Sequence, residues 1–579
     1  MTYIRLCKPI GKGYKEVKLL IVGGVAGGAT AAARARRLNE HAEIVLFERG
    51  EFISFANCGL PYYIGDIIKK RQDLLVTTPK DFQERYAVDV RVFSEVLSID
   101  RSAKTVTVKN LASGKTYTET YDKLMLAPGA EPVKPPLAGI DLENIFNLRN
   151  IPDMDRIKAF VDQNRPESAV VVGGGFIGLE MTENLVHRGV GVTIVERQEH
   201  VMPLLDHEMA GLVHAFLEEK GVDCIRSDGI KSFARDGKRL AVETEKGRRL
   251  VCDLAIVCVG IRPENRLAKE AGLEIGPMGG IRVDASMRTS DPDIYAVGDA
   301  AEIFDYLTGR RTMTPLAGPA NKQGRIAADN IMGRSSIFKG TLGTLVVKIF
   351  DATLASTGLS EKILKARDMP YMVSYTHSGS HASYYPDAEM MAVKLLFTPN
   401  NGRILGAQIF GREGVDKRID VIATAIHGSM TVFHLEELEL AYAPQYSSAK
   451  DPVNIAGFAA ANLIRGDVRS INWGALDGLD PEKDVLIDVR TRAELKQSGE
   501  IKGALHIPVH ELRSHLPGLD PKKRYIVFCS IGFRGYIAYR ILMQNGFDSL
   551  NLSGGFRTLL GAREKMMAES PGTSLWLGE

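Results

Sequence analysis

The sequence predicts an α/β protein built around two repeated βαβ units. Apolar strands at residues 17–22 and 169–172 each run into a glycine-rich turn, and a helix follows each turn. The two turns begin 150 residues apart, at Gly23 and Gly173. A buried strand that passes through such a turn into a helix is the first half of a dinucleotide-binding unit. Two such units in one chain imply that two nucleotides meet at one site.

Length, charge and cysteine content exclude several classes of protein. The 579 residues include 73 Lys and Arg against 71 Asp and Glu, so the formal net charge is +2. This balance gives no basic face for nucleic acid, and no apolar run approaches the ~18 residues of a membrane span. The six cysteines are too few for a disulfide scaffold and lack the spacing of a zinc site. We therefore expect a cytoplasmic protein without a metal, a nucleic-acid partner or a membrane segment.

The first glycine turn is predicted to hold a pyrophosphate. It comprises Gly23, Gly24, Val25, Ala26, Gly27 and Gly28, with Val25 in place of the middle glycine of the GxGxxG pattern. Glycines let the backbone approach phosphate, and the helix N-terminus supplies amide donors. Glu48 lies 20 residues after Gly28, at the end of a predicted strand over residues 43–47. A carboxylate there can hold ribose hydroxyls; the alternative is a tight turn without a ligand.

The second turn satisfies the glycine pattern in full. Gly173, Gly175 and Gly178 stand at the GxGxxG positions, with Ile177 between the last two. Glu196 follows 18 residues after Gly178. A carboxylate at this place accepts from an adenosine 2′-OH and repels a 2′-phosphate, which favours NADH over NADPH. Arg197 beside it leaves NADPH open.

A single cysteine follows the first βαβ unit. Cys58 stands in the segment SFANCGLPY, and no other cysteine lies within 49 residues on either side. A flavoenzyme that cycles an internal disulfide would need a second cysteine close by. A lone thiol still reacts when the partner sulfur is external, as a mixed disulfide or persulfide. The alternative is a packed structural cysteine.

A second isolated cysteine begins a loop near the C-terminus. Cys529 and Arg534 enclose four residues between a predicted strand, YIVF, and a predicted helix. Backbone amides of such a loop form a cup around sulfur, and the arginine holds an anionic sulfur species. A phosphatase loop usually has five residues between Cys and Arg, so four favour sulfur over phosphate.

Two stretches of the chain resemble known families. The segment SFANCGLPYYIG, the first turn without its middle glycine and TSDPDIYAVGD at 289–299 resemble coenzyme A disulfide reductases. These are single-cysteine flavoproteins of the pyridine nucleotide–disulfide oxidoreductase superfamily, and the resemblance covers residues 18–465. Residues 475–579, with Asp488, Arg490 and Glu494, resemble a rhodanese domain. That resemblance implies that Cys529 carries a persulfide.

The resemblance implies a domain order. We expect two Rossmann-like dinucleotide-binding domains, an α+β dimerisation domain and a C-terminal rhodanese-like α/β domain. In the dimerisation domain the sequence predicts strands near residues 344–350 and 392–397 and helices near 418–428 and 450–464. The expected segments are a tail (1–17), an FAD-binding domain (18–150 and 276–335), an NAD(P)H-binding domain (151–275), the dimerisation domain (336–465), a linker (466–474) and the rhodanese domain (475–579).

The resemblance also implies the cofactors and the partner subunit. FAD, NADH (with NADPH possible) and coenzyme A are expected, in a homodimer whose active site is completed by the other subunit. Tyr384 and Tyr442 would reach across the dimer toward the partner's redox cysteine and donate a proton to a departing thiolate; Tyr385 is a near-equal candidate for the role of Tyr384. Interface packing is the alternative role. Further candidates for cofactor binding are Arg49, Ala127, Asp299 and Gly260.

Coenzyme A binding is expected at five positions that match the family: Thr30, Arg37, Ser54, Asn57 and Lys450. Arginine and lysine suit phosphates, although a solvated surface charge is the alternative at Arg37 and Lys450. Two positions depart from the family, because Asn321 replaces an expected histidine and Tyr86 an expected lysine.

Together these features predict an FAD-dependent NADH:persulfide or polysulfide reductase that releases sulfide, with Cys58, Cys529, Tyr384, Tyr442 and Arg534 in the catalytic set. The rhodanese cysteine favours this function, since plain disulfide reduction gives it no use. One alternative is a coenzyme A disulfide reductase. Another, of a different class, is a non-catalytic sulfur carrier or redox sensor.

Overall fold

The computed structural model describes residues 16–569, and it divides them between two compact units. Residues 1–15 of the expected tail and 570–579 of the expected rhodanese segment lie outside this description. Unit 1 consists of the chain up to Pro135 together with Phe146–Arg165 and Val259–Thr341; unit 2 consists of Pro136–Ile145, Pro166–Cys258 and the chain from Leu342. The division is coarser than the predicted segments, whose boundaries stay predictions.

Unit 1 is built on a parallel sheet with strand order β19-β7-β1-β2-β3. The strands are β1 (Lys18–Val22), β2 (Glu43–Phe47), β3 (Asp89–Arg91), β7 (Lys123–Leu126) and β19 (Ile294–Ala296). The predicted strand over 43–47 is therefore confirmed. Leu19, Leu20 and Ile21 of β1 have no exposed surface, as expected for the middle strand of a sheet covered on both faces.

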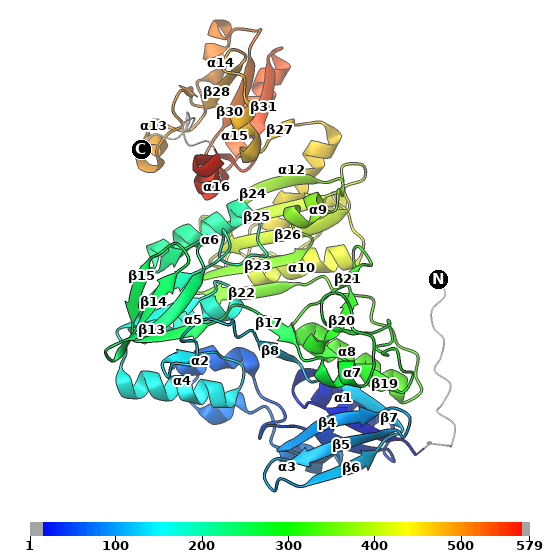
Figure 1. Ribbon diagram of the computed structural model, residues 1–579. Coiled ribbons are helices and arrows are strands. Elements are labelled where there is room, and N and C mark those ends of the chain that lie inside the picture. Colours follow the sequence, from blue (N-terminus) through cyan, green and yellow to red (C-terminus); the bar gives the residue numbers. More distant parts are fainter. Residues whose placement is uncertain (1–15, 570–579) are drawn as a thin grey trace. The chain divides into compact units, whose positions relative to one another are not determined.

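Helices and a small antiparallel sheet complete unit 1 (Figure 1). Helix α1 (Ala26–Leu38) packs on α8 (Ala317–Ile331), and a Cβ on Gly324 would overlap the backbone of Gly27. The other elements are α2 (Leu60–Ile64), α3 (Pro79–Tyr86), α4 (Ile151–Asn164), α7 (Arg266–Glu270), the meander β4 (Ser94–Asp100), β5 (Thr105–Asn110) and β6 (Thr116–Thr120), and the short strands β8 (Ala130–Pro132), β17 (Ile261–Pro263), β18 (Ile281–Arg282), β20 (Ala301–Phe304) and β21 (Arg311–Thr312).

Unit 2 contains four strands of a second parallel sheet, in the order β12-β11-β10-β16. These are β10 (Ser168–Val172), β11 (Gly191–Val195), β12 (Asp223–Ile225) and β16 (Leu254–Val257). Helix α5 (Phe176–His187) follows β10, and α6 (His207–Glu219) follows β11; a meander is formed by β13 (Ile230–Asp236), β14 (Arg239–Thr244) and β15 (Arg249–Cys252). The second βαβ unit is thereby confirmed.

An antiparallel sheet follows in unit 2, with order β22-β23-β26-β25-β24. Its strands are β22 (Leu345–Ile349), β23 (Ala352–Gly358), β24 (Met372–Gly379), β25 (Met390–Phe397) and β26 (Ile404–Gly411), with helices α9 (Glu361–Ala366), α10 (Val415–His427), α11 (Val432–Glu437) and α12 (Pro452–Arg465). The strands and helices predicted for this α+β segment are confirmed, although α10 begins at Val415, before the expected residue 418.

The last segment of unit 2 is a parallel sheet with order β27-β31-β30-β28-β29. Its elements are β27 (Ser470–Ile471), β28 (Asp484–Asp488), α13 (Arg492–Ser498), β29 (Leu505–His506), α14 (Leu512–His515), β30 (Arg524–Phe528), α15 (Phe533–Gln544), β31 (Asp548–Leu552) and α16 (Gly555–Glu569). Helix α16 packs directly on α6 (Figure 1). The two helices touch through glycines, because a Cβ on Gly211 would overlap the carbonyl of Gly561.

One buried ammonium group joins several elements of unit 2. Lys394 of β25 has 0% exposure, and its Nζ lies 2.6 Å from Glu208 Oε1 of α6 and 2.6 Å from Glu361 Oε2 of α9. Asp206, which caps α6, is 3.0 Å away. Tyr375 of β24 donates its hydroxyl to Glu208 at 3.0 Å. Because three carboxylates surround one cation, this ion must stay charged for the elements to remain together.

Loss of that ammonium should destabilise unit 2. In Lys394→Met the carboxylates lose their counterion, and breaking a buried pair costs about 3–5 kcal/mol. Lys365→Met is the matched control, since Lys365 also pairs with Glu361, at 2.8 Å, but its side chain is 65% exposed; an exposed pair contributes about 1 kcal/mol or less. Differential scanning calorimetry at pH 7 measures both, and equal losses in the two variants would contradict the role of Lys394.

The same cluster predicts a pH dependence. Burial acts to raise the pKa of Glu361, but the charge of Lys394 and hydrogen bonds from Lys365, Lys394 and Tyr371 lower it to about 2 from its ordinary 4.5. A lowered carboxyl pKa stabilises the fold above the unfolded value and loses that effect as pH falls. The difference in melting temperature between wild type and Lys394→Met should therefore shrink from pH 4.5 downward. A difference that is constant between pH 7 and 3 would disprove this.

Candidate functional site

The first predicted turn requires glycine for steric reasons. Gly23 has φ +95°, and a Cβ there would overlap the carbonyl oxygen of Ala127. A Cβ on Gly28 would overlap the carbonyl of Gly23. Val25 sits at the N-cap of α1, where a side chain is accommodated. The turn therefore presents bare backbone between β1 and α1, the form a pyrophosphate cradle needs.

Glu48 lies beside this turn. Its two oxygens accept hydrogen bonds from the backbone N–H groups of Gly24, at 3.1 Å, and Gly50, at 2.8 Å. Neighbouring Arg49 makes an ion pair of 3.1 Å with Glu131. Burial raises the pKa of the Asp299 carboxyl, with Arg149 opposing the rise. These residues all belong to unit 1 and fit the chemistry expected for a flavin dinucleotide, whose ribose and phosphates need such acceptors and amides.

The second turn repeats this construction in unit 2. Gly173 has φ +101°, and a Cβ on Gly178 would overlap its carbonyl. Gly175 caps α5 and has open space where a Cβ would be, which leaves room for a phosphate. Buried Glu196 accepts from the backbone N–H groups of Gly174 and Gln198, both at 2.7 Å. The cradle and its carboxylate fit a nicotinamide dinucleotide.

Two other predicted cofactor residues, and the arginine beside Glu196 that left NADPH open, occupy specific places. Ile177 belongs to the first turn of α5. Gly260, in unit 1, has φ +108° and open space at its Cβ position. Arg197 makes an exposed ion pair of 3.4 Å with Glu245. This pairing gives the arginine a carboxylate partner, which weakens the case for a 2′-phosphate.

Cys58 is exposed and lies in a short 3-10 turn, Asn57–Gly59, directly before α2. The segment is held by its backbone, since Ala56 N–H donates to Leu74 at 2.8 Å and Val76 N–H donates to Ser54 at 3.1 Å. Within residues 16–569 the other cysteines all belong to unit 2. The described part of unit 1 therefore contains no second cysteine.

Two of the other cysteines are poor nucleophiles. Burial raises the pKa of the Cys252 thiol to about 11 and that of Cys258 to about 12. Since the thiolate is the reactive form, these two side chains stay protonated at neutral pH. Of the other described cysteines, Cys224 lies half-buried in strand β12, whereas Cys58 and Cys529 each lie in a turn or loop directly before a helix, the setting expected for sulfur chemistry.

The predicted coenzyme A residues are spread over both units. Arg37 and Asn57 are exposed in unit 1 and Lys450 is exposed in unit 2, while Ser54 is half-buried. The hydroxyl of Thr30 donates a hydrogen bond of 2.5 Å to Asn321. A residue predicted to bind coenzyme A therefore contacts the asparagine that replaces the family's histidine. Tyr86, the other departure, packs on Phe82 with ring centroids 4.9 Å apart. Their role in binding coenzyme A stays a prediction.

The structure brings the two predicted tyrosines together. The hydroxyl groups of Tyr384 and Tyr442 are 2.5 Å apart, and the side chains are 73% and 47% exposed. This hydrogen bond raises the pKa of Tyr442. Tyr385 instead packs on His381, with centroids 5.7 Å apart. Tyr384 and Tyr442 thus form an exposed pair of phenols, whereas Tyr385 lies outside this pair and its ring contacts His381.

The Cys529 loop joins β30 to α15, and α16 forms its other wall. Cys529 is fully buried, and Gly532 closes the loop with φ +91°. Phe556 N–H donates to the carbonyl of Cys529 at 2.8 Å, and Arg557 N–H donates to that of Ser530 at 2.9 Å. The first turn of α16 therefore fixes the loop, while the same helix packs on α6.

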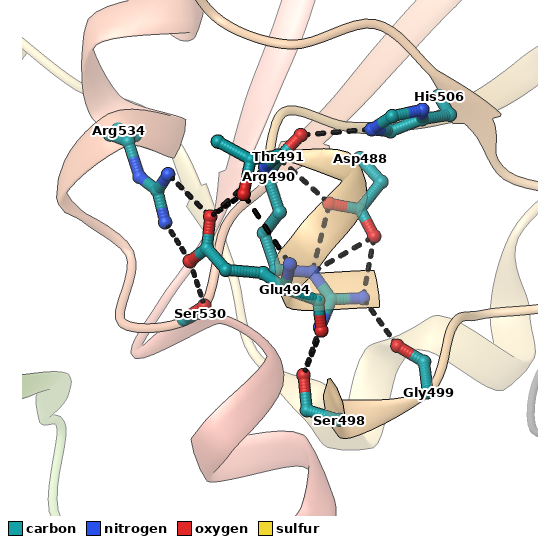
Figure 2. A network of polar contacts seen from close by, with 9 residues as sticks. All are labelled: Asp488, Arg490, Thr491, Glu494, Ser498, Gly499, His506, Ser530 and Arg534. Atoms are coloured by element: carbon teal, nitrogen blue, oxygen red, sulfur yellow. Dashed lines mark hydrogen bonds and ion pairs between the residues drawn. The ribbon is translucent and has the colours of Figure 1, made fainter. Parts of the chain in front are cut away.

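A polar network surrounds this loop (Figure 2). Arg534 donates to Glu494 Oε2 at 2.8 Å and also to its other oxygen, which accepts from Ser530 Oγ at 2.9 Å. Arg490 is fully buried, bound to Asp488 at 2.7 Å, and stacked on Phe556. Sequence reasoning named Glu494 only through the family and missed Ser530. The capping box formed by Thr491 and Glu494 was the available local signal.

The sequence predicts neither a membrane-spanning segment nor a metal site, and the structure gives observations on both. Among residues 16–569 no helix has the length and apolar character needed to cross a bilayer. Two groups of described residues have the spacing of metal ligands: Glu199 with His200 and His207, and Asp206 with Glu208 and Glu361. The second group holds the Lys394 ammonium. In the first, His200 Nε2 and His207 Nδ1 share a hydrogen bond of 3.1 Å.

Comparison with known proteins matches this architecture segment by segment. Family models match for pyridine nucleotide-disulphide oxidoreductase at residues 17–324, its dimerisation domain at 345–452 and a rhodanese-like domain at 475–561. Coenzyme A disulfide reductase of Staphylococcus haemolyticus is 38% identical over 447 residues, covering 77% of this chain and 100% of the relative.

Two solved structures extend the match to nearly the whole chain. Reduced CoADR-RHD of Bacillus anthracis is 49% identical with a TM-score of 0.93, covering 95% of this chain and 99% of that one. A NAD-dependent persulfide reductase from A. fulgidus is 37% identical with a TM-score of 0.87, covering 93% and 99%. The order of two nucleotide-binding domains, a dimerisation domain and a rhodanese domain is confirmed.

Glu196 should set the choice of nicotinamide nucleotide. Glu196→Gln keeps the shape of the side chain but removes the charge that repels a 2′-phosphate, and it weakens a charged hydrogen bond to the ribose of about 1.5–3 kcal/mol. The Kd for NADH should rise about tenfold, while that for NADPH stays or falls. Glu48→Gln, at the equivalent place of the first turn, is the matched control and should change neither Kd in fluorescence titration. A proportional rise for both nucleotides would exclude this role.

Proposed function

The chain belongs to the pyridine nucleotide–disulphide oxidoreductase family, and we propose that it is an FAD-dependent enzyme that uses NADH to reduce persulfides or polysulfides and releases sulfide. The observation that carries this proposal is the presence of two isolated cysteines in settings suited to sulfur transfer: exposed Cys58 in unit 1 and Cys529 in its C-x4-R loop. Neither has a cysteine neighbour in the chain. Each therefore needs a sulfur partner from a substrate.

The nucleotide-binding turns and Cys58 have separate roles in the proposed reaction: the turns bind the dinucleotides, and Cys58 attacks the sulfur substrate. The Gly23 turn, Glu48 and Asp299 would hold a flavin. The chemistry that a flavin would supply is to accept a hydride from NADH and to pass two electrons to sulfur. The Cys58 thiolate attacks the outer sulfur of a persulfide RS–SH; the S–S bond breaks, RS⁻ leaves and Cys58–S–SH forms. Two electrons from NADH then convert this group to the Cys58 thiolate and HS⁻. The exposure of Cys58 admits the bulky thiol that such a step requires.

The tyrosine pair supplies the proton for the leaving thiolate. Its raised pKa keeps Tyr442 protonated at neutral pH, so the phenol can act as a donor. The match to the family's dimerisation domain supports a homodimer. We propose that Tyr384 and Tyr442 serve the partner's redox cysteine, and that Thr30, Arg37, Ser54, Asn57 and Lys450 bind coenzyme A.

A second candidate function is reduction of coenzyme A disulfide. The similarity of residues outside the rhodanese segment to coenzyme A disulfide reductases favours it. Cys58 then attacks one sulfur of the disulfide and coenzyme A thiolate leaves. Comparison of kcat/KM for coenzyme A persulfide and coenzyme A disulfide discriminates between the two functions. A sulfur carrier without catalysis would show no steady NADH oxidation with either. A thiol-dependent reaction of this kind is suited to the reducing cytoplasm.

Replacement of Cys58 tests the proposal. Cys58→Ser should lower NADH-dependent sulfide release from coenzyme A persulfide about 100-fold or more, because the nucleophile is lost. Cys252→Ser, which replaces a buried thiol of raised pKa, is the control and should retain turnover. Sulfide is measured by methylene blue formation, and flavin absorbance checks that both variants bind FAD. Unchanged turnover in Cys58→Ser would eliminate the proposed mechanism.

The phenol pair gives a second test. Tyr442→Phe removes the proton donor and should reduce kcat about 100-fold, within the usual range for general acids, with a small change in KM. Tyr385→Phe is the matched control because its ring packs on His381. Donors whose leaving thiols are more acidic should restore the rate of Tyr442→Phe, since they need less protonation. Equal losses in Tyr442→Phe and Tyr385→Phe would point to packing instead.

A further inference from the structure

The cation of the Cys529 loop is already paired within the domain. Arg534 binds both oxygens of Glu494, and Figure 2 shows the guanidinium facing this carboxylate. Both side chains are 29% exposed, so the pair is partly open to solvent and does not belong to the core. Hydrogen bonds from Arg534, and then from Thr491 and Ser530, hold the pKa of Glu494 well below its ordinary range. Glu494 is therefore ionised at neutral pH.

Arg490, the other arginine of the network, does not add an unpaired positive charge to the loop. Arg490 is fully buried, and Asp488 binds it through Nε and a terminal nitrogen at 3.0 and 2.7 Å. The remaining donors of Arg490 bind Ser498 and the carbonyl of Gly499, both at 2.9 Å. Each arginine in Figure 2 thus has a carboxylate partner. A sulfur donor that approaches Cys529 meets an arginine whose charge is offset and a carboxylate that repels anions.

This arrangement distinguishes between classes of sulfur donor. Thiosulfate is a compact dianion whose charge lies next to the sulfur that is transferred. A thiol-bound sulfane sulfur, RS–SH or RS–S⁻, carries at most one charge at its reacting end. Repulsion by a fixed carboxylate grows with the charge on the donor, and like charges placed against the wrong partner are a common source of specificity.

We propose that Glu494 determines donor specificity at Cys529: it offsets Arg534 and thereby selects thiol persulfides over thiosulfate. The inference rests on the proposed function, in which Cys529 carries sulfane sulfur. In the selected step the Cys529 thiolate attacks the outer sulfur of RS–S⁻, the S–S bond breaks, RS⁻ leaves and Cys529–S–S⁻ forms. In the disfavoured step the same thiolate attacks the sulfane sulfur of thiosulfate and sulfite leaves. In this proposal Glu494 acts on the donor through Arg534 and by its charge, and not by direct contact.

The test uses the full-length holoenzyme that carries Cys58→Ser, without NADH, so that the sulfur transfer measured is that of Cys529 and not that proposed for Cys58. Cyanide accepts sulfur from Cys529–S–S⁻ to give thiocyanate and the thiolate, and thiocyanate is detected as its iron complex. The two donors are thiosulfate and glutathione persulfide. Glu494→Gln keeps an oxygen that can accept from Arg534 and Ser530 but removes the charge. It should raise kcat/KM for thiosulfate at least tenfold, mainly through KM, and change kcat/KM for the persulfide less than threefold.

A matched control separates charge from local structure. Thr491→Val removes a hydrogen bond to the same carboxylate, and the cap of α13, without a change in charge; it should leave the ratio of the two kcat/KM values unchanged. Glu494→Ala, which also removes the charge, provides a second variant if Glu494→Gln folds poorly. An unchanged ratio in both Glu494 variants, or an equal shift in Thr491→Val, would overturn the inference.

Mass spectrometry keeps this result apart from the proposed function. Wild-type protein incubated with glutathione persulfide should gain one sulfur atom on Cys529. If Cys529 gains sulfur from neither donor, the proposed role of this cysteine fails together with the inference. If it gains sulfur from both donors and the Glu494 variants show the wild-type ratio, only the specificity assigned to Glu494 fails.

Discussion

The fully buried ammonium group of Lys394 is the interaction on which unit 2 depends. It contacts Glu208 on α6, Glu361 on α9 and the N-cap Asp206. Glu208 also accepts from Tyr375, whose backbone N–H donates to Ser553 in the rhodanese segment at 3.3 Å. The charge of Lys394 therefore joins the nucleotide-binding segment to the antiparallel sheet, and the backbone of Tyr375 extends the contact to the rhodanese segment. Such a cluster is costly to bury, and it persists because any separation of the elements would leave carboxylates unpaired.

Local patterns were sufficient to predict most of the fold. The strand before Glu48 has the predicted bounds, and both glycine turns join a strand to a helix as expected. The physical reason is that a buried parallel strand and a glycine turn are each determined by a few consecutive residues, whose apolar character or lack of a Cβ can be recognised directly in the sequence. The spacing from the turn to Glu48 or Glu196 is also local, and both carboxylates do lie at their turns.

Contacts between distant residues could not be predicted in this way. Lys394 stands in an otherwise apolar strand, and nothing near it in sequence reveals the carboxylates, which lie up to 188 residues away. The pairing of Arg534 with Glu494 spans 40 residues. The hydrogen bond between Tyr384 and Tyr442 spans 58, and only a family resemblance had grouped the two. Tertiary packing decides such pairs, and a single sequence does not encode them in a readable pattern.

The two cysteines on which the proposed function rests differ in setting. Cys58 is exposed in a short turn, whereas Cys529 is buried in a loop held by the first turn of α16. That helix packs on α6 through glycine contacts that tolerate no side chain, and α6 carries Glu208 of the Lys394 cluster. The Cys529 loop is therefore fixed, through α16, to helix α6 of unit 2.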